Sequence, residues 1–192
     1  KKAAGFAESQ NVPGVFTAFV GYEWTSMIEG NNLHRVVLFR DGADKATQLP
    51  PYSSLDSLDP EQLWAAMQRY ETKTGGQVMS IPHNGNVSDG WIYSTNKFLR
   101  GPMDARYAAR QQLNEPLTEI IQTKGSSDTH PAMSPNDEFA NFEIFPNLIN
   151  VGMPSQIKHG YIRQGLVDGM ILEEQLGTNP FKMGIVSGAD SH

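Results

Sequence analysis

The sequence predicts an α/β fold with mostly parallel strands, in a single domain that spans residues 1–192. Two observations predict it. Short runs rich in β-branched and aromatic residues alternate along the chain with helix-prone segments that have apolar residues at helical spacing. Several of the apolar runs end on polar residues next to glycine or proline, as buried strands do. Alternation of strand and helix is typical of α/β domains, and 192 residues are enough for one domain with a sizeable core.

Two strands are expected in the first forty residues. Residues 15–24 form a run of β-branched and aromatic side chains that ends near Glu23. Residues 34–40 form a second run, which stops at the turn pair Asp41-Gly42. The first run therefore delivers a carboxylate to the end of a buried strand.

A helix with strong boundary signals follows in the middle of the chain. Asp59 is placed as its N-cap, Pro60 occupies the first helical position, and Gly75 ends it. The run at residues 77–81 is then a third strand, which leads directly into His83. A second predicted strand thus ends on a residue able to bind a metal.

The second half of the chain repeats the alternation. Residues 103–114 are helix-prone, residues 116–122 form a strand, residues 161–177 form a helix, and residues 182–186 form the last strand. Residues 137–145 are ambiguous, because phenylalanine recurs every three residues while a proline follows directly.

Composition excludes several classes of function. The net charge is −6 and no basic cluster exceeds two residues, which disfavours binding to nucleic acid. No apolar stretch approaches the roughly 20 residues that span a bilayer, so no membrane span is expected. The chain has no cysteine, so any metal must be held by nitrogen and oxygen ligands.

Carboxylate and imidazole groups follow the predicted strand ends. Glu23, His83, Asp190 and His192 all lie at or just past the C-terminal end of a predicted strand. Such ends meet at one rim of a parallel α/β fold, so these residues are expected to converge on zinc, manganese or iron. His34 lies at the N-terminal end of its predicted strand and not at the C-terminal end, so its position alone favours neither a functional nor a structural role.

Some of these residues also have a structural explanation that does not involve a metal. Glu23 is also placed to cap a neighbouring backbone, and an Asp-x-His sequence near a chain end also suits a solvated tail. Other chemistries have no signal: the sequence contains no Gly-x-Ser-x-Gly nucleophile motif, no Gly-x-Gly-x-x-Gly motif and no Walker motif.

Five short motifs, in this order, resemble the PHP (polymerase and histidinol phosphatase) superfamily. They are Gly21-Tyr22-Glu23-Trp24-Thr25-Ser26, Asn32-Leu33-His34-Arg35, Ile81-Pro82-His83-Asn84-Gly85-Asn86, Asn179-Pro180-Phe181-Lys182 and Gly188-Ala189-Asp190-Ser191-His192. The resemblance extends from about Pro13 to His192 and is to the branch of larger bacterial PHP-like proteins that carries a domain of unknown function.

The resemblance implies a partial distorted (β/α)7 TIM-like barrel with two or three divalent metal ions at its C-terminal rim. It implies hydrolysis of phosphoesters, with a small anionic ester as substrate and metal-activated water. The implied metal ligands are Glu23, His34, His83, Asp190 and His192; the implied catalytic residues are Glu23, His83 and Arg35; and Arg35, Asn84 and Lys124 are candidate phosphate contacts.

The sequence departs from the family pattern at its start. The first strand with its His-x-His motif and the following Thr-Asp-His or Thr-Glu-His motif are absent, so the chain resembles an internal fragment that lacks the first strands. A barrel without these strands has an open edge, which favours homo-oligomers. The compartment of the parent protein stays open between periplasmic, secreted and cytoplasmic.

Two alternatives to phosphoester hydrolysis remain. One is a metallohydrolase that acts on sulfate or phosphonate esters or on a carbon–nitrogen bond. The other is a non-catalytic binding module in which the barrel persists with a degenerate metal site.

Overall fold

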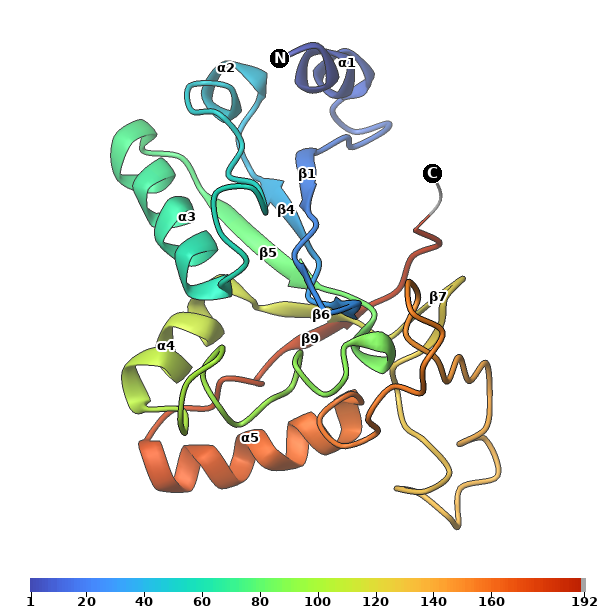
Figure 1. The fold of residues 1–192 in the computed structure, drawn as a ribbon. Coiled ribbons are helices and arrows are strands. Elements are labelled where there is room, and N and C mark those ends of the chain that lie inside the picture. Colours follow the sequence, from blue (N-terminus) through green and yellow to red (C-terminus); the bar gives the residue numbers. More distant parts are fainter. Residues whose placement is uncertain (191–192) are drawn as a thin grey trace.

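The computed structural model describes residues 1–190 as a mixed α/β protein with five α-helices and nine short strands (Figure 1). The helices are α1 (Lys2–Gln10), α2 (Ala43–Ala46), α3 (Pro60–Thr74), α4 (Ala105–Asn114) and α5 (Ile162–Leu176). The strands are β1 (Val20–Trp24), β2 (Met27–Ile28), β3 (Asn31–Asn32), β4 (Arg35–Phe39), β5 (Val78–Pro82), β6 (Leu117–Glu119), β7 (Ile121–Gln122), β8 (Gly125–Ser126) and β9 (Gly184–Val186). A 3₁₀ turn, η1 (Gly85–Val87), follows β5. The α/β class expected from the sequence is confirmed for the described residues.

The largest sheet has the strand order β1-β4-β5, and β4 is antiparallel to both neighbours. The expectation of mostly parallel strands was therefore wrong for this sheet. The segment 25–34, which joins β1 to β4, is too short for the crossover of a dozen or more residues that a parallel pair needs. Among the described strands the parallel pairing is β6 with β9, β2-β3 and β7-β8 form small antiparallel pairs, and these sheets do not close into a barrel.

Helix α3 has the boundaries that its sequence predicts. The Asp59 side chain accepts a hydrogen bond from the backbone N–H of Glu61 at 2.8 Å, which caps the first turn. Gly75 ends the helix in the left-handed conformation, with φ of 64°. Leu63 and Trp64 on its inner face are almost fully buried and join the main core. Local signals were sufficient here because the caps and the apolar face agree.

Two expected strands are shorter in the structure. The run at 15–24 becomes a strand only at Val20, because a turn with a bridge between Val12 and Phe16 occupies the segment before it. The run at 116–122 divides into β6 and β7, since Ile120 lies between two different strand pairings. The ambiguous segment 137–145 contains turns and irregular backbone, without a helix or a strand.

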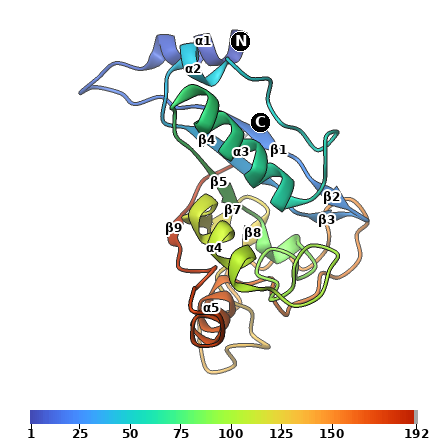
Figure 2. The same ribbon diagram turned by 90° about the vertical axis from the view of Figure 1, so that its left-hand side faces the viewer.

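The helices α3, α4 and α5 lie along one side of the strands, whereas α1 and α2 pack together at one end (Figures 1 and 2). The main core lies between the strands and the helices α3, α4 and α5. Its largest fully buried side chains include Trp24, Trp64, Tyr93 and Phe181. None of the described helices combines the length and the apolar composition that a membrane span requires.

A buried ion pair connects the sheet to the helices. Arg35 on β4 donates from Nε to Glu115 Oε1 at 3.0 Å, and the two residues are 2% and 0% exposed. Trp64 Nε1 on α3 donates to the same oxygen at 2.9 Å, and Gln111 Nε2 on α4 donates to the other oxygen at 3.3 Å. This network joins β4, α3 and α4 through one carboxylate.

We expect the Glu115→Gln variant to lower the free energy of unfolding by about 3 kcal/mol, because it leaves the buried charge of Arg35 without a counter-charge. Urea unfolding measures the change. The matched control is Glu174→Gln at an exposed position of α5, which we expect to leave stability unchanged. Equal stability of the two variants would show that the pair does not support the fold.

Candidate metal centre

Three strand ends meet at one edge of the β1-β4-β5 sheet. Because β1 and β5 run opposite to β4, their C-terminal ends lie beside the N-terminal end of β4. Glu23 is the penultimate residue of β1, His83 follows β5 and His34 precedes β4. The antiparallel direction of β4 therefore brings His34 to the same edge, which the assumption of parallel strands did not predict.

The three side chains also project from the same face of the sheet. The backbone N–H of His83 donates to the carbonyl of His34 at 3.4 Å, which extends the β4-β5 pairing by one residue. Side chains two residues apart in a strand point to the same face, and directly paired residues share a face. Glu23 is paired with Val36, two residues beyond His34, so its side chain lies on the face that carries both histidines.

Close contacts join the three side chains. Glu23 Oε1 lies 2.7 Å from His34 Nδ1 and 3.2 Å from His83 Nε2. The two rings are nearly perpendicular, with centroids 5.7 Å apart. One ligand atom from each residue lies within 4.8 Å of the others, so the three are close enough to bind one ion. We call this group the Glu23–His34–His83 cluster.

The three side chains of the cluster are buried to different extents, with Glu23 the most exposed and His83 the most buried. The exposed fraction of the side chain falls from 35% at Glu23 to 15% at His34 and 3% at His83. The far nitrogens, His34 Nε2 and His83 Nδ1, are buried and have no partner among the described residues. Each ring therefore makes a polar contact through one nitrogen only. These nitrogens, His34 Nδ1 and His83 Nε2, both face Glu23 Oε1.

The carboxylate of Glu23 carries its charge at neutral pH. Hydrogen bonds from His34, and then from His83, hold the pKa of the Glu23 carboxyl well below its ordinary value, although partial burial opposes them. An ionised oxygen between two imidazoles is a donor set that divalent ions accept.

Asp190 lies near the cluster but has other partners in the structure. Its carboxylate accepts a hydrogen bond from Gln122 Nε2 at 2.8 Å and contacts the ammonium of Lys124. Asp190 and Glu23 line one open hollow of about 410 Å³. His192, the other expected ligand at this end, lies outside the described residues.

Arg35, a catalytic candidate from the family resemblance, faces the helices and not the cluster. Adjacent residues in a strand point to opposite faces, so the side chains of His34 and Arg35 diverge. The Arg35 guanidinium is paired with Glu115 and lies over the Trp24 ring, 5.9 Å from its centroid. The structure therefore gives Arg35 a structural role.

Two further polar residues, Gln122 and Glu119, lie at the same edge and were not predicted from the sequence. Gln122 Nε2 donates to Asn84 Oδ1 at 2.7 Å, and Glu119 ends β6 in the surroundings of His83. Burial raises the pKa of the Glu119 carboxyl. The rule that predicted Glu23 and His83, applied to the predicted strand at 116–122, indicates Gln122, whereas Glu119 lies in the middle of that run and becomes a strand end only because β6 stops there.

Asn86 locks the segment after β5 to the β7-β8 hairpin. Its Nδ2 donates to the carbonyl of Lys124 at 3.0 Å, and its Oδ1 accepts from Ser127 Oγ at 2.9 Å. Its backbone N–H donates to the same hydroxyl at 3.1 Å. The segment that carries His83 and the turn that carries Lys124 are therefore held in fixed relation.

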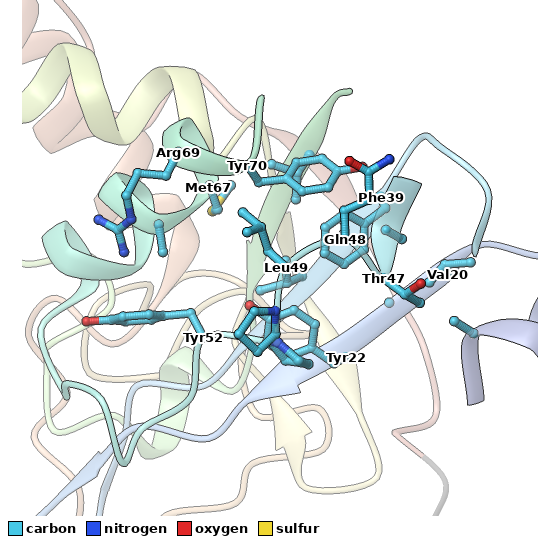
Figure 3. Close-up of a pocket in the computed structure, with 18 of the residues that line it drawn as sticks. Val20, Tyr22, Phe39, Thr47, Gln48, Leu49, Tyr52, Met67, Arg69 and Tyr70 are labelled. Atoms are coloured by element: carbon cyan, nitrogen blue, oxygen red, sulfur yellow. The ribbon is translucent and has the colours of Figure 1, made fainter. Parts of the chain in front are cut away.

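A larger cavity, of about 700 Å³, lies on the other face of the same sheet (Figure 3). Aromatic and apolar side chains such as Tyr22, Phe39, Met67 and Tyr70 surround it. Tyr22 lines this cavity while its neighbour Glu23 belongs to the opposite face, which separates the cavity from the cluster. The cavity has no group of ligands comparable to the cluster among the described residues.

The fold and the cluster define an α/β protein with a candidate metal site of two histidines and one carboxylate. The chain belongs to the family described as Protein of unknown function (DUF3604), whose family model matches residues 1–192. No curated protein and no solved structure matches the chain.

We expect the Asn86→Ala variant to lower the free energy of unfolding by about 2 kcal/mol, because it removes the side-chain hydrogen bonds that the Lys124 carbonyl and the Ser127 hydroxyl make with Asn86. Chemical denaturation gives the value. Asn96→Ala, at an exposed position, is the control and is expected to be neutral. A neutral Asn86→Ala variant would mean that the two segments do not depend on this contact.

Proposed function

We propose that this chain provides part of the metal centre of a metal-dependent hydrolase of phosphoesters of the PHP type. The observation that carries the proposal is the Glu23–His34–His83 cluster, in which three ligand atoms from three strand ends lie within 4.8 Å of one another. The residues come from three of the motifs that resemble the PHP superfamily. The geometry and the resemblance thus point to the same residues independently.

The cluster fits a divalent ion by its chemistry. Two imidazole nitrogens and one carboxylate are a common ligand set for zinc, manganese or iron, and three protein ligands leave coordination positions open. When bound, such an ion acts as a Lewis acid and lowers the pKa of a bound water to about 7. By the resemblance, Asp190 and His192 complete the ligand set and a second or third ion is held nearby.

The residues of the chain have distinct parts in this proposal. The ionised Glu23 carboxylate orients both imidazoles and contributes the negative charge of the site. The buried His83 anchors the cluster to the end of β5. The hollow shared by Glu23 and Asp190 gives a small anionic ester access to the cluster.

For the fold, we propose that the β1-β4-β5 sheet and the β6-β9 pair are parts of the wall of a distorted, incomplete (β/α)7 barrel. The helices α3, α4 and α5 lie outside these strands as barrel helices do (Figure 1). β1 is an edge strand in the described sheet, and Phe19 before it is 58% exposed. An open edge of this kind supports association into homo-oligomers.

Elemental analysis and titration with zinc or manganese test the metal centre. We expect about one equivalent or more per chain, and we expect Glu23→Gln to lower the affinity more than about tenfold because it removes the anionic ligand without changing its shape. His130→Gln, outside the cluster, is the matched control. We expect chelation to lower the melting temperature of the wild type, and an unchanged melt with no bound metal would contradict the centre.

The reaction is tested with aryl phosphate, sulfate and phosphonate esters as substrates of the metal-loaded protein. We expect hydrolysis of the phosphate ester, with kcat/KM at least about 100-fold lower in Glu23→Gln than in His130→Gln. Preference for the sulfate or phosphonate ester would replace the phosphoesterase proposal, and turnover that is unaffected by Glu23→Gln would contradict the assigned site.

A further inference from the structure

Two side-chain donors converge on a single carboxylate oxygen beside the Glu23–His34–His83 cluster. Gln122 Nε2 donates to Asp190 Oδ2 at 2.8 Å, and the ammonium of Lys124 contacts the same oxygen. A carboxylate oxygen and a phosphate oxygen accept hydrogen bonds in the same way, and both prefer charged donors. The structure therefore contains an arrangement of donors that holds an anionic oxygen.

A third donor belongs to the same network and lacks an acceptor. Gln122 Oε1 accepts from the backbone N–H of Lys124 at 2.8 Å, which fixes the orientation of the Gln122 amide. Its Nε2 must then donate, and Asn84 Oδ1 accepts it at 2.7 Å. The Nδ2 of Asn84 is therefore the group left over. It is fully buried and has no partner among the described residues.

The backbone conformation of Asn84 determines where its side chain begins. Asn84 has φ of 55°, in the left-handed region, and it directly follows His83. The conformation keeps an unpaired amide donor next to a residue of the cluster.

The donors are also fixed relative to one another. Asn86 Nδ2 donates to the carbonyl of Lys124, and Gln122 Oε1 accepts from the N–H of Lys124. Both polar groups of the Lys124 backbone are therefore hydrogen-bonded. Gly125, which follows, has φ of 100°, and a Cβ at this position would lie 2.5 Å from Phe145 Cβ. A tight turn thus presents the Lys124 side chain from a rigid base.

We propose that Lys124, Gln122 and Asn84 form a subsite for a tetrahedral oxyanion, such as inorganic phosphate or the phosphoryl group of a monoester. In the structure the Asp190 carboxylate fills the part of this subsite that Lys124 and Gln122 line. A bound oxyanion replaces this carboxylate and also accepts from Asn84 Nδ2. The assignment of the anion as the substrate's phosphoryl group rests on the proposed function, whereas binding of free phosphate does not.

Calorimetric titration with inorganic phosphate tests the subsite, in chelator-treated and in metal-loaded protein. We expect Lys124→Met to weaken phosphate binding about tenfold or more, because it removes the charged donor of the subsite. Lys158→Met, an exposed position with the same change of charge, is the control and is expected to bind as the wild type does. Asn84→Asp, which keeps the size of the side chain but removes the N–H donor, is expected to weaken binding as well.

The outcomes separate this proposal from the metal centre. Weaker phosphate binding in Lys124→Met, with metal content and melting temperature unchanged, supports the subsite. Equal phosphate affinity in Lys124→Met and Lys158→Met overturns it, and so does the absence of phosphate binding to the wild type at millimolar concentration in both metal states. A Lys124-dependent affinity in protein that binds no metal would keep the subsite and contradict the proposed hydrolase. For the metal-loaded enzyme, a rise in KM for a phosphate ester in Lys124→Met assigns the anion to the substrate, whereas an unchanged KM limits the subsite to free phosphate.

Discussion

The buried ion pair between Arg35 and Glu115 is the constraint on which the rest of the structure depends. Both charges are out of contact with water, and burial of this kind is tolerated only when the charges are paired and hydrogen-bonded. Trp64 from α3 shares the same carboxylate oxygen, so the pair joins the sheet to two helices. It also fixes which face of β4 each residue occupies. With Arg35 held on the helix face, His34 must lie on the other face, where the cluster forms.

The direction of β4 then completes the cluster. A strand that opens on histidine contributes to an edge formed by two strand ends only when it runs opposite to them. The short connection between β1 and β4 imposes this direction, and the pairing of β4 with β5 brings His34 beside His83. Glu23 lies on the same face and contacts both rings. Chain connectivity and strand alternation together therefore place three side chains that are able to bind a metal at one point.

Groups with unused bonding capacity gather at this edge of the fold. The far nitrogens of His34 and His83 and the amide nitrogen of Asn84 are buried without partners among the described residues. Most buried polar groups in proteins are paired, so the three unpaired groups at this edge are exceptions that a bound ligand would explain. The interlocked loops around Asn86 hold these groups in place. These unpaired groups lie where we propose ligands of two kinds, a cation at the cluster and an anion at Lys124.

The sequence by itself determined the features that short-range interactions control. These are the α/β class, the caps of α3, and the positions of Glu23 and His83 at strand ends, because caps, turns and apolar periodicity act within a few residues. The tertiary structure alone decided the direction of β4, the contacts of Glu23 with His34 and His83, and the burial of Arg35 against Glu115. Each of these depends on which distant segment a strand pairs with or a charge meets. Such pairings join residues far apart in the chain, and no local pattern in the sequence encodes them.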